Sequence, residues 1–230
     1  MPPHPQRQAA FAVCYFSAYV GYLFLYQEHE LLHWLSLVLI PLMALSIIGK
    51  YPSRRVLLES VGVGGGRATR GMTWVIVLGV AFQVLQLLNS RQRRELVGIL
   101  REPLGFLLPL GALVLLIGTV ATTEEVFFRG ILQSRLSNWI RNEPVALVLA
   151  TIAFALYHLP YAYLNPAWPS AGNFSSAVQA AAANGVPAGL ALGFVYWRSG
   201  RNLLAPILLH AFIDLIPATR LVHGMLLTPR

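Results

Sequence analysis

Residues 103–123 read PLGFLLPLGALVLLIGTVATT, without a charged side chain, and Glu124 and Glu125 follow directly. An uncharged stretch of about 20 residues is long enough to cross the hydrocarbon core of a bilayer as a helix. A charged side chain at that depth raises the free energy of insertion by about 2.5 to 3.5 kcal/mol. The sequence therefore predicts a membrane helix whose carboxyl groups are there for a functional reason.

The rest of the chain has the same apolar character. Its 230 residues are 56% hydrophobic and 11% charged, and the mean hydropathy is +0.61. Several windows of about 20 apolar residues fit a bilayer, so the predicted fold class is all-α, a polytopic transmembrane helical bundle of about seven spans (roughly six to eight). The expected spans are approximately 10–27, 31–49, 71–89, 110–138, 144–160, 177–197 and 203–222.

The basic residues fall between these apolar segments. The net charge is +8, but basic residues distributed in this way are typical of membrane loops, so we expect a lipid bilayer as the partner and no nucleic acid. The segment 90–102 carries four arginines among apolar residues and is expected to be an amphipathic helix at the membrane surface. Cys14 is the only cysteine, which excludes an internal disulfide and a thiolate metal cluster.

Two prolines lie in the uncharged segment 103–123. Pro103 and Pro109 argue against one straight helix from 103 to 138. The part near 103–110 is therefore expected to form a separate short or re-entrant element.

Other ionisable residues lie in later apolar runs. Asp214 is the only aspartate of the chain and follows His210 by four residues, and His158 ends the run 145–158. Ionisable groups inside a membrane usually face one another and mark a functional site. We therefore expect Glu124, His158, His210 and Asp214 to form an intramembrane site.

The turns between spans allow these groups to meet. Glu124 precedes the expected turn at Arg141 by as many residues as separate that turn from His158. In an antiparallel helical hairpin, equal offsets give equal depth, here roughly 25 Å from the turn at about 1.5 Å per residue. The next turn on that face is expected near 199–200, and His210 and Asp214 follow it at a similar distance.

Spacing within the helices points to local pairs. Glu125 and Arg129 are four residues apart, so this pair is expected to satisfy the charge of Arg129 and to leave Glu124 free as a base. Phe154 and His158 have the same spacing, which predicts a ring contact.

These residues resemble the CAAX-protease and bacteriocin-processing family of intramembrane endopeptidases, also called the Abi family. The likeness covers about 105–220 and consists of three motifs in order: Glu124-Glu125-Val-Phe-Phe-Arg129, Phe154-Ala-Leu-Tyr-His158 and His210-Ala-Phe-Ile-Asp214. The eukaryotic prenyl-protein enzymes have Asn at the position of Asp214, and bacterial members commonly have Asp there. We therefore divide the chain into N-terminal helices and basic loops (1–102) and a catalytic helical core (103–230).

The resemblance implies hydrolysis of a peptide bond in a membrane-associated protein or peptide, in a bacterial inner (cytoplasmic) membrane. Glu124 and His158 would activate water, and His210 and Asp214 would orient it or hold the oxyanion. The supporting residues would be Glu125, Arg129 and Phe154. No cofactor is favoured, although these two histidines and two carboxylates are an alternative set of zinc ligands. Prenylated CAAX proteins, bacteriocin self-immunity, peptide maturation and anchor processing all remain open as substrate systems.

Other functions are also open at this stage. The segment His29-Glu30-Leu-Leu-His33 matches the zinc-protease helix signature, but it lies between the first two expected spans and lacks a convincing third-ligand motif. Buried acids and histidines also build proton- or ion-coupled transporters, although we find no inverted repeat. A non-catalytic chaperone or immunity protein is the third class.

Overall fold

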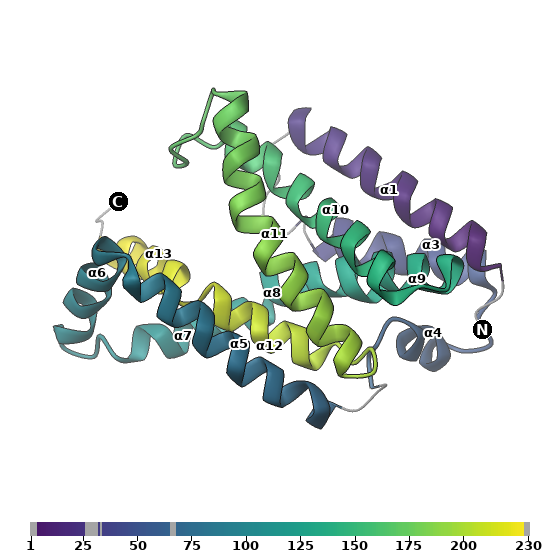
Figure 1. Ribbon diagram of the computed structural model, residues 1–230, viewed down its shortest axis with the longest axis horizontal. Coiled ribbons are helices and arrows are strands. Elements are labelled where there is room, and N and C mark those ends of the chain that lie inside the picture. The colour runs from purple at the N-terminus through teal and green to yellow at the C-terminus, as the bar shows by residue number, and fades with distance from the viewer. Residues whose placement is uncertain (1–3, 26–31, 33, 65–67, 228–230) are drawn as a thin grey trace.

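The computed structural model describes residues 4–25, 32, 34–64 and 68–227, and all regular structure in them is helical (Figure 1). The elements are α1 (Pro5–Leu25), η1 (Leu35–Leu39), α3 (Ile40–Gly49), α4 (Arg54–Ser60), α5 (Ala68–Leu88), α6 (Ser90–Arg101), α7 (Leu107–Gly118), α8 (Val120–Glu125), η2 (Val126–Gln133), α9 (Ser134–Ile140), α10 (Glu143–Leu164), α11 (Phe174–Arg198), α12 (Leu204–Ile213) and α13 (Leu215–Leu227).

Among the described residues, five helical stretches are long and apolar enough to cross a membrane. They are Pro5–Leu25, Ala68–Leu88, Leu107–Ile140, Glu143–Leu164 and Phe174–Arg198. Two bent pairs raise the count to as many as seven: Leu35–Gly49 with Arg54–Ser60, bent by 111°, and Leu204–Ile213 with Leu215–Leu226, bent by 59°. The predicted all-helical, multi-pass membrane fold is confirmed.

The segment 103–110 differs from our expectation. It forms a turn over residues 103–106 and then the first residues of α7, rather than a separate element. Leu104 has a φ of 64° in this turn. Pro109 lies in the first turn of α7, where the missing N–H has no helical partner to lose, so this proline does not break the helix.

The long span Leu107–Ile140 is irregular in its middle. Thr119, with φ −126° and ψ −101°, separates α7 from α8, and the eight residues of η2 form a π-helix. Threonine hydroxyls donate to nearby carbonyls, as Thr119 Oγ1 does to Leu115 O at 2.6 Å and Thr123 Oγ1 to Thr119 O at 3.1 Å. Such bonds satisfy backbone groups in a broken membrane helix. The break leads directly into Glu124 and Glu125.

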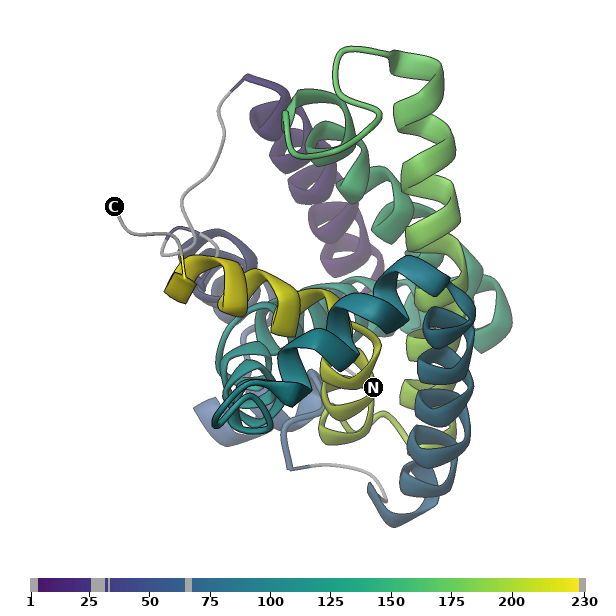
Figure 2. The same cartoon turned by 90° about the vertical axis from the view of Figure 1, so that its left-hand side faces the viewer.

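Glycines allow α10 and α11 to lie close together. A Cβ at Gly185 would come within 2.5 Å of Ala155 Cα, and one at Gly189 within 2.9 Å of Thr151 Cγ2. Small residues of this kind let membrane helices approach closely. This contact packs α11 along α10, one of the helices that carry the candidate site, and α11 crosses in front of α8 in the view of Figure 1. Figure 2 shows the same arrangement from the side.

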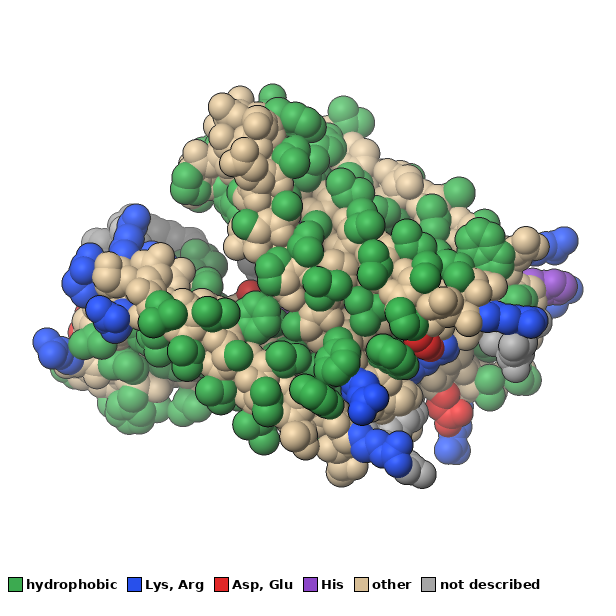
Figure 3. All heavy atoms as spheres, in the orientation of Figure 1, with side chains coloured by type: hydrophobic (Ala, Val, Ile, Leu, Met, Phe, Trp, Pro, Cys, Tyr) green, Lys and Arg blue, Asp and Glu red, His purple; other side chains and the backbone are tan. Residues whose placement is uncertain are grey.

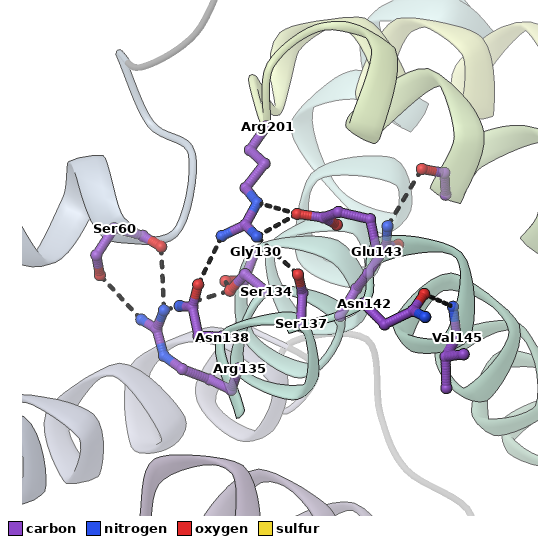
Figure 4. A network of polar contacts seen from close by, with 12 residues as sticks. Ser60, Gly130, Ser134, Arg135, Ser137, Asn138, Asn142, Glu143, Val145 and Arg201 are labelled. Carbon is purple, nitrogen blue, oxygen red and sulfur yellow. Dashed lines mark hydrogen bonds and ion pairs between the residues drawn. The ribbon is translucent and has the colours of Figure 1, made fainter. Parts of the chain in front are cut away.

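The α9–α10 turn is fastened by a polar network (Figure 4). Arg201 donates to Glu143 Oε1 at 2.8 Å from Nε and to Asn138 Oδ1 at 2.8 Å from Nη1. Arg135 donates to Ser60 Oγ at 2.9 Å, which ties α4 to the same end of the bundle. The turn lies at Arg141, as predicted, and this residue adopts a left-handed conformation (φ 59°).

Charged side chains gather at the ends of the molecule. Hydrophobic side chains cover the middle of the visible face, and Lys and Arg side chains lie on both sides of it (Figure 3). The helix α6 lies at one end, and α4 and α9 lie at the other (Figure 1). The four arginines of α6 are therefore far from the arginines of the α9–α10 turn. Basic residues thus flank the apolar surface at both ends.

Candidate active site

Glu124 and Glu125 end the short helix α8, immediately after the threonine-rich break. Both are buried, with 5% and 0% of their surface exposed, and Arg129 is equally buried at 1%. Two adjacent carboxyl groups and an arginine are costly to bury without partners. The contacts of these three residues therefore define the site.

His210, from α12, is the centre of this site. Its Nδ1 lies 2.8 Å from Glu125 Oε1, and its Nε2 lies 3.2 Å from Asp214 Oδ2. The same Nε2 is 3.8 Å from Glu124 Oε2. One imidazole therefore joins the two glutamates of α8 to the aspartate at the end of α12.

Glu125 contacts both His210 and Arg129 through one carboxylate oxygen. Arg129 Nη1 donates to Glu125 Oε1 at 3.1 Å, so the predicted pair is present, and the same oxygen also faces His210. Arg129 Nη2 donates to Gly189 O at 3.3 Å, which connects the pair to α11. The contact between Glu125 and His210 was missed by the sequence analysis, because no local spacing relates residues that lie 85 positions apart.

His158 and Phe154 form the second part of the site. His158 Nδ1 lies 2.8 Å from Phe154 O. A carbonyl only accepts, so Nδ1 carries a proton, and in the neutral form of the ring Nε2 then carries a lone pair. The Phe154 ring centroid lies 4.7 Å from that of His158 and 5.9 Å from that of His210. Arg129 lies over the same ring at 4.5 Å.

The predicted site residues are therefore not all in direct contact. Glu124, His210 and Asp214 come together, whereas His158 is joined to them through the Phe154 ring, and no hydrogen bond links His158 to Glu124 among the described residues. Equal offsets from the turn give equal depth only where both arms of the hairpin are regular α-helix. The π-helix η2 lies in the first arm, so residue counting does not give the depth of Glu124.

Two oxygens of the site have no hydrogen-bond partner. Glu124 Oε2 and Glu125 Oε2 are both buried and unpaired within the described part of the chain. A buried unpaired acceptor is costly, and such groups often have a functional role. The site is not sealed, because the side chain of Asp214 is 39% exposed. Figure 3 shows a hollow in the surface with an acidic side chain inside it.

The alternative set of zinc ligands does not fit this arrangement. Within the described ranges, no three His, Cys, Asp or Glu side chains are placed to hold one metal ion. The ring of Phe154 contacts both His158 and His210, and His210 Nε2 already faces Asp214. The residues His29, Glu30 and His33 of the second zinc signature lie outside the described residues.

Comparison with known families finds a match over the segment that carries the site. The family model described as type II CAAX prenyl endopeptidase Rce1-like matches residues 103–216. This segment belongs to the Rce1-like family. Comparisons with curated proteins and with solved structures find no match.

Membership of the Rce1-like family makes the chain a CAAX-type peptide hydrolase of the membrane. The matched segment contains every residue of the site described above, from Glu124 to Asp214. The resemblance seen in the sequence is confirmed. The helices α1 to α6 precede the match.

Proposed function

We propose that this Rce1-like protein is an intramembrane endopeptidase in which Glu124 and His158 activate the attacking water. One observation carries the proposal: a buried carboxylate oxygen, Glu124 Oε2, has no hydrogen-bond partner among the described residues and lies 3.8 Å from His210 Nε2. A carboxylate in this state accepts a proton readily from a bound water, as a general base must.

In the proposed reaction, the side chains of the site receive the proton of the attacking water and return it to the leaving amine. The water oxygen attacks the scissile carbonyl carbon while its proton passes to Glu124 or to the free Nε2 of His158. The carbonyl oxygen takes the negative charge of the tetrahedral intermediate. The C–N bond then breaks, and the stored proton goes to the leaving amine. General bases of this kind typically contribute a factor of about 10² to 10⁴ to the rate.

His210 and Asp214 serve the oxyanion in this proposal. An N–H aimed at the developing negative oxygen stabilises the intermediate. The single N–H of His210 Nε2 lies 3.2 Å from Asp214 Oδ2 and 3.8 Å from Glu124 Oε2, and in this proposal the oxyanion shares it with Asp214 when the intermediate forms. An ionised Asp214 cannot donate, so its role is to hold the His210 ring from a distance of 3.2 Å. Glu125 fixes the opposite nitrogen, and Arg129 balances the charge of Glu125.

The position of the site inside a candidate membrane span restricts the class of substrate. Glu124 lies within the candidate span Leu107–Ile140, so the scissile bond must enter the membrane, and a membrane-associated protein or peptide meets this need. The aspartate at position 214 is common among bacterial relatives, which supports a location in a bacterial inner membrane.

The test compares protein termini in cells that carry the native chain, Glu124→Gln or the control Glu59→Gln. Glu59 is an exposed residue of α4 that pairs only with Arg55 among the described residues. The native chain and the control should produce the same new termini on membrane or secreted proteins, and Glu124→Gln should produce none at equal abundance. Identical termini in all three strains would contradict the proposed hydrolysis and favour a transport or chaperone role.

A further inference from the structure

The bend at Asp214 has a cause in the sequence. The helix α12 ends at Ile213, α13 begins at Leu215, and the two are bent by 59°. Pro217 lies four residues after Ile213 and has no N–H to give to the Ile213 carbonyl, and its ring would clash with that carbonyl in a straight helix. The break therefore leaves a backbone acceptor without its helical donor in a candidate span, where unsatisfied groups are costly.

Two glutamines of α5 donate to the last carbonyls of α12, and one of them supplies the donor that Ile213 lacks. Gln86 Nε2 donates to Ile213 O at 2.6 Å, and Gln83 Nε2 donates to Phe212 O. They are three residues apart and so lie on one face of α5. They are conspicuous there, because the helix from Met72 to Leu88 is otherwise almost entirely apolar. The carbonyls that they bind immediately precede Asp214.

Close packing sets the register between α5 and α12. At the start of both helices, a Cβ at Gly71 would lie 2.7 Å from Ala205 Cβ. Further along, Gly79 faces Phe212, with 3.7 Å between the Gly79 Cβ position and Phe212 Cβ. The two helices therefore run side by side up to the bend, and α5 has only one way to present its glutamines.

The bend determines where the Asp214 carboxylate lies. Asp214 N donates to His210 O at 3.0 Å, and Asp214 O accepts from Ala218 N at 2.9 Å, so the residue is bonded to both helices. Its side chain faces His210 Nε2. A change in the angle between α12 and α13 would move this carboxylate relative to the imidazole.

We propose that Gln83 and Gln86 are positioning residues that hold the α12–α13 bend and thereby the contact between Asp214 and His210. The importance of that contact rests on the proposed function. Both glutamines lie outside the family match at 103–216, in a helix to which no role was assigned. A small misplacement of a reacting group can lower a rate by about a hundredfold.

The first test measures the bend itself and needs no substrate. Nitroxide labels are placed on α13 and α10 by Leu221→Cys and Leu149→Cys, both exposed positions, after the only native cysteine is removed by Cys14→Ser. Electron-resonance distances are recorded for the full chain in nanodiscs. The double variant Gln83→Leu/Gln86→Leu should shift or broaden the distance between the labels. The matched control Gln179→Leu, an exposed residue of α11, should leave it unchanged.

The second test measures processing of the termini that the native chain produces and Glu124→Gln does not. Gln86→Leu should slow their appearance at least about tenfold at equal protein abundance. Adding Pro217→Ala restores an N–H for the Ile213 carbonyl within the helix. We expect this second change to recover the melting temperature of Gln86→Leu but not its processing rate, because a helix without Pro217 and Gln86 has nothing to hold the bend that places Asp214.

The outcomes separate the two proposals. An unchanged label distance in the double glutamine variant would overturn the positioning role. A shifted distance with normal processing would overturn the link between the bend and the site. If the native chain produces no termini but the distance still shifts, the proposed hydrolysis fails while the structural role of the glutamines stands.

Discussion

At the residue scale, the site is held by a small number of direct contacts around His210. Both of its ring nitrogens face carboxylates, at 2.8 Å for Glu125 and 3.2 Å for Asp214. The neighbouring glutamates Glu124 and Glu125 therefore have different surroundings. Among the described residues each keeps one oxygen without a hydrogen bond, but Glu125 Oε1 contacts Arg129 at 3.1 Å and His210 at 2.8 Å, whereas Glu124 Oε2 comes no nearer than 3.8 Å to His210 Nε2. Two identical side chains in different environments commonly take different roles.

Asp214 gives a prediction at this scale. If its role is to accept from His210, the amide oxygen of Asp214→Asn can do the same, while Asp214→Leu cannot. We expect Asp214→Asn to retain processing within about tenfold of the native chain and Asp214→Leu to lose more than about a hundredfold. The rate at which native-specific termini appear checks this. Equal activity of both variants would show that the contact with His210 is dispensable.

At the element scale, the site depends on helices that are broken or closely packed. The break at Thr119 and the π-helix η2 place Glu124 and Glu125, and the bend at Asp214 ends α12. The glycines of α11 allow this helix to pack closely against α10, and Gly189 O accepts directly from Arg129. Irregular helices of this kind are tolerated inside a membrane protein when their freed backbone groups find partners.

Gly185 tests the packing of α10 and α11. A Cβ at this position would lie 2.5 Å from a backbone atom, Ala155 Cα, which cannot give way cheaply. Gly185→Ala should destabilise the protein by about 1 to 3 kcal/mol, the usual range for overpacking. The control Gly111→Ala lies on α7, has no heavy atom within 4 Å of its Cβ position, and should raise stability by about 0.5 to 1 kcal/mol. Thermal unfolding in one detergent compares the two, and an equal effect would contradict close packing at Gly185.

At the scale of the whole molecule, the segment before the family match contacts the segment after it. Arg220 of α13 forms an ion pair with Glu95 of α6, and His223 lies 2.9 Å from Glu102 Oε2. These four side chains line a cavity of about 350 Å³. These contacts link α6 to α13. The chain leads from α6 through α7 and α8 to the site, and α12 and α13 lead from the site back to α6.

The ion pair between Arg220 and Glu95 is expected to contribute only modestly to the free energy of unfolding. The Arg220 and Glu95 side chains are each about one third exposed, so solvent screens their attraction. Arg220→Glu should therefore lower the free energy of unfolding by no more than about 1 kcal/mol, and adding Glu95→Arg should restore it. Thermal unfolding at low and high salt measures both effects. A loss that the reversed pair does not recover would show that Arg220 acts through packing rather than charge.

The sequence by itself determined the class of fold, the main spans, the turns at Arg141 and near Gly200, and the family. These features are local: an apolar run must form a helix in a membrane because its backbone groups have no water to bind. The three motifs are local as well, since each fits within two turns of helix.

Only the tertiary structure decided which of these groups meet. The contact of Glu125 with His210 and those of Gln83 and Gln86 with the end of α12 join residues more than 80 positions apart. Such contacts depend on which helix faces pack together, and that is set by small residues, prolines and breaks acting jointly rather than by hydropathy. The physical reason is that lipid drives every apolar segment into the membrane alike, while close packing and the satisfaction of buried polar groups select its neighbours.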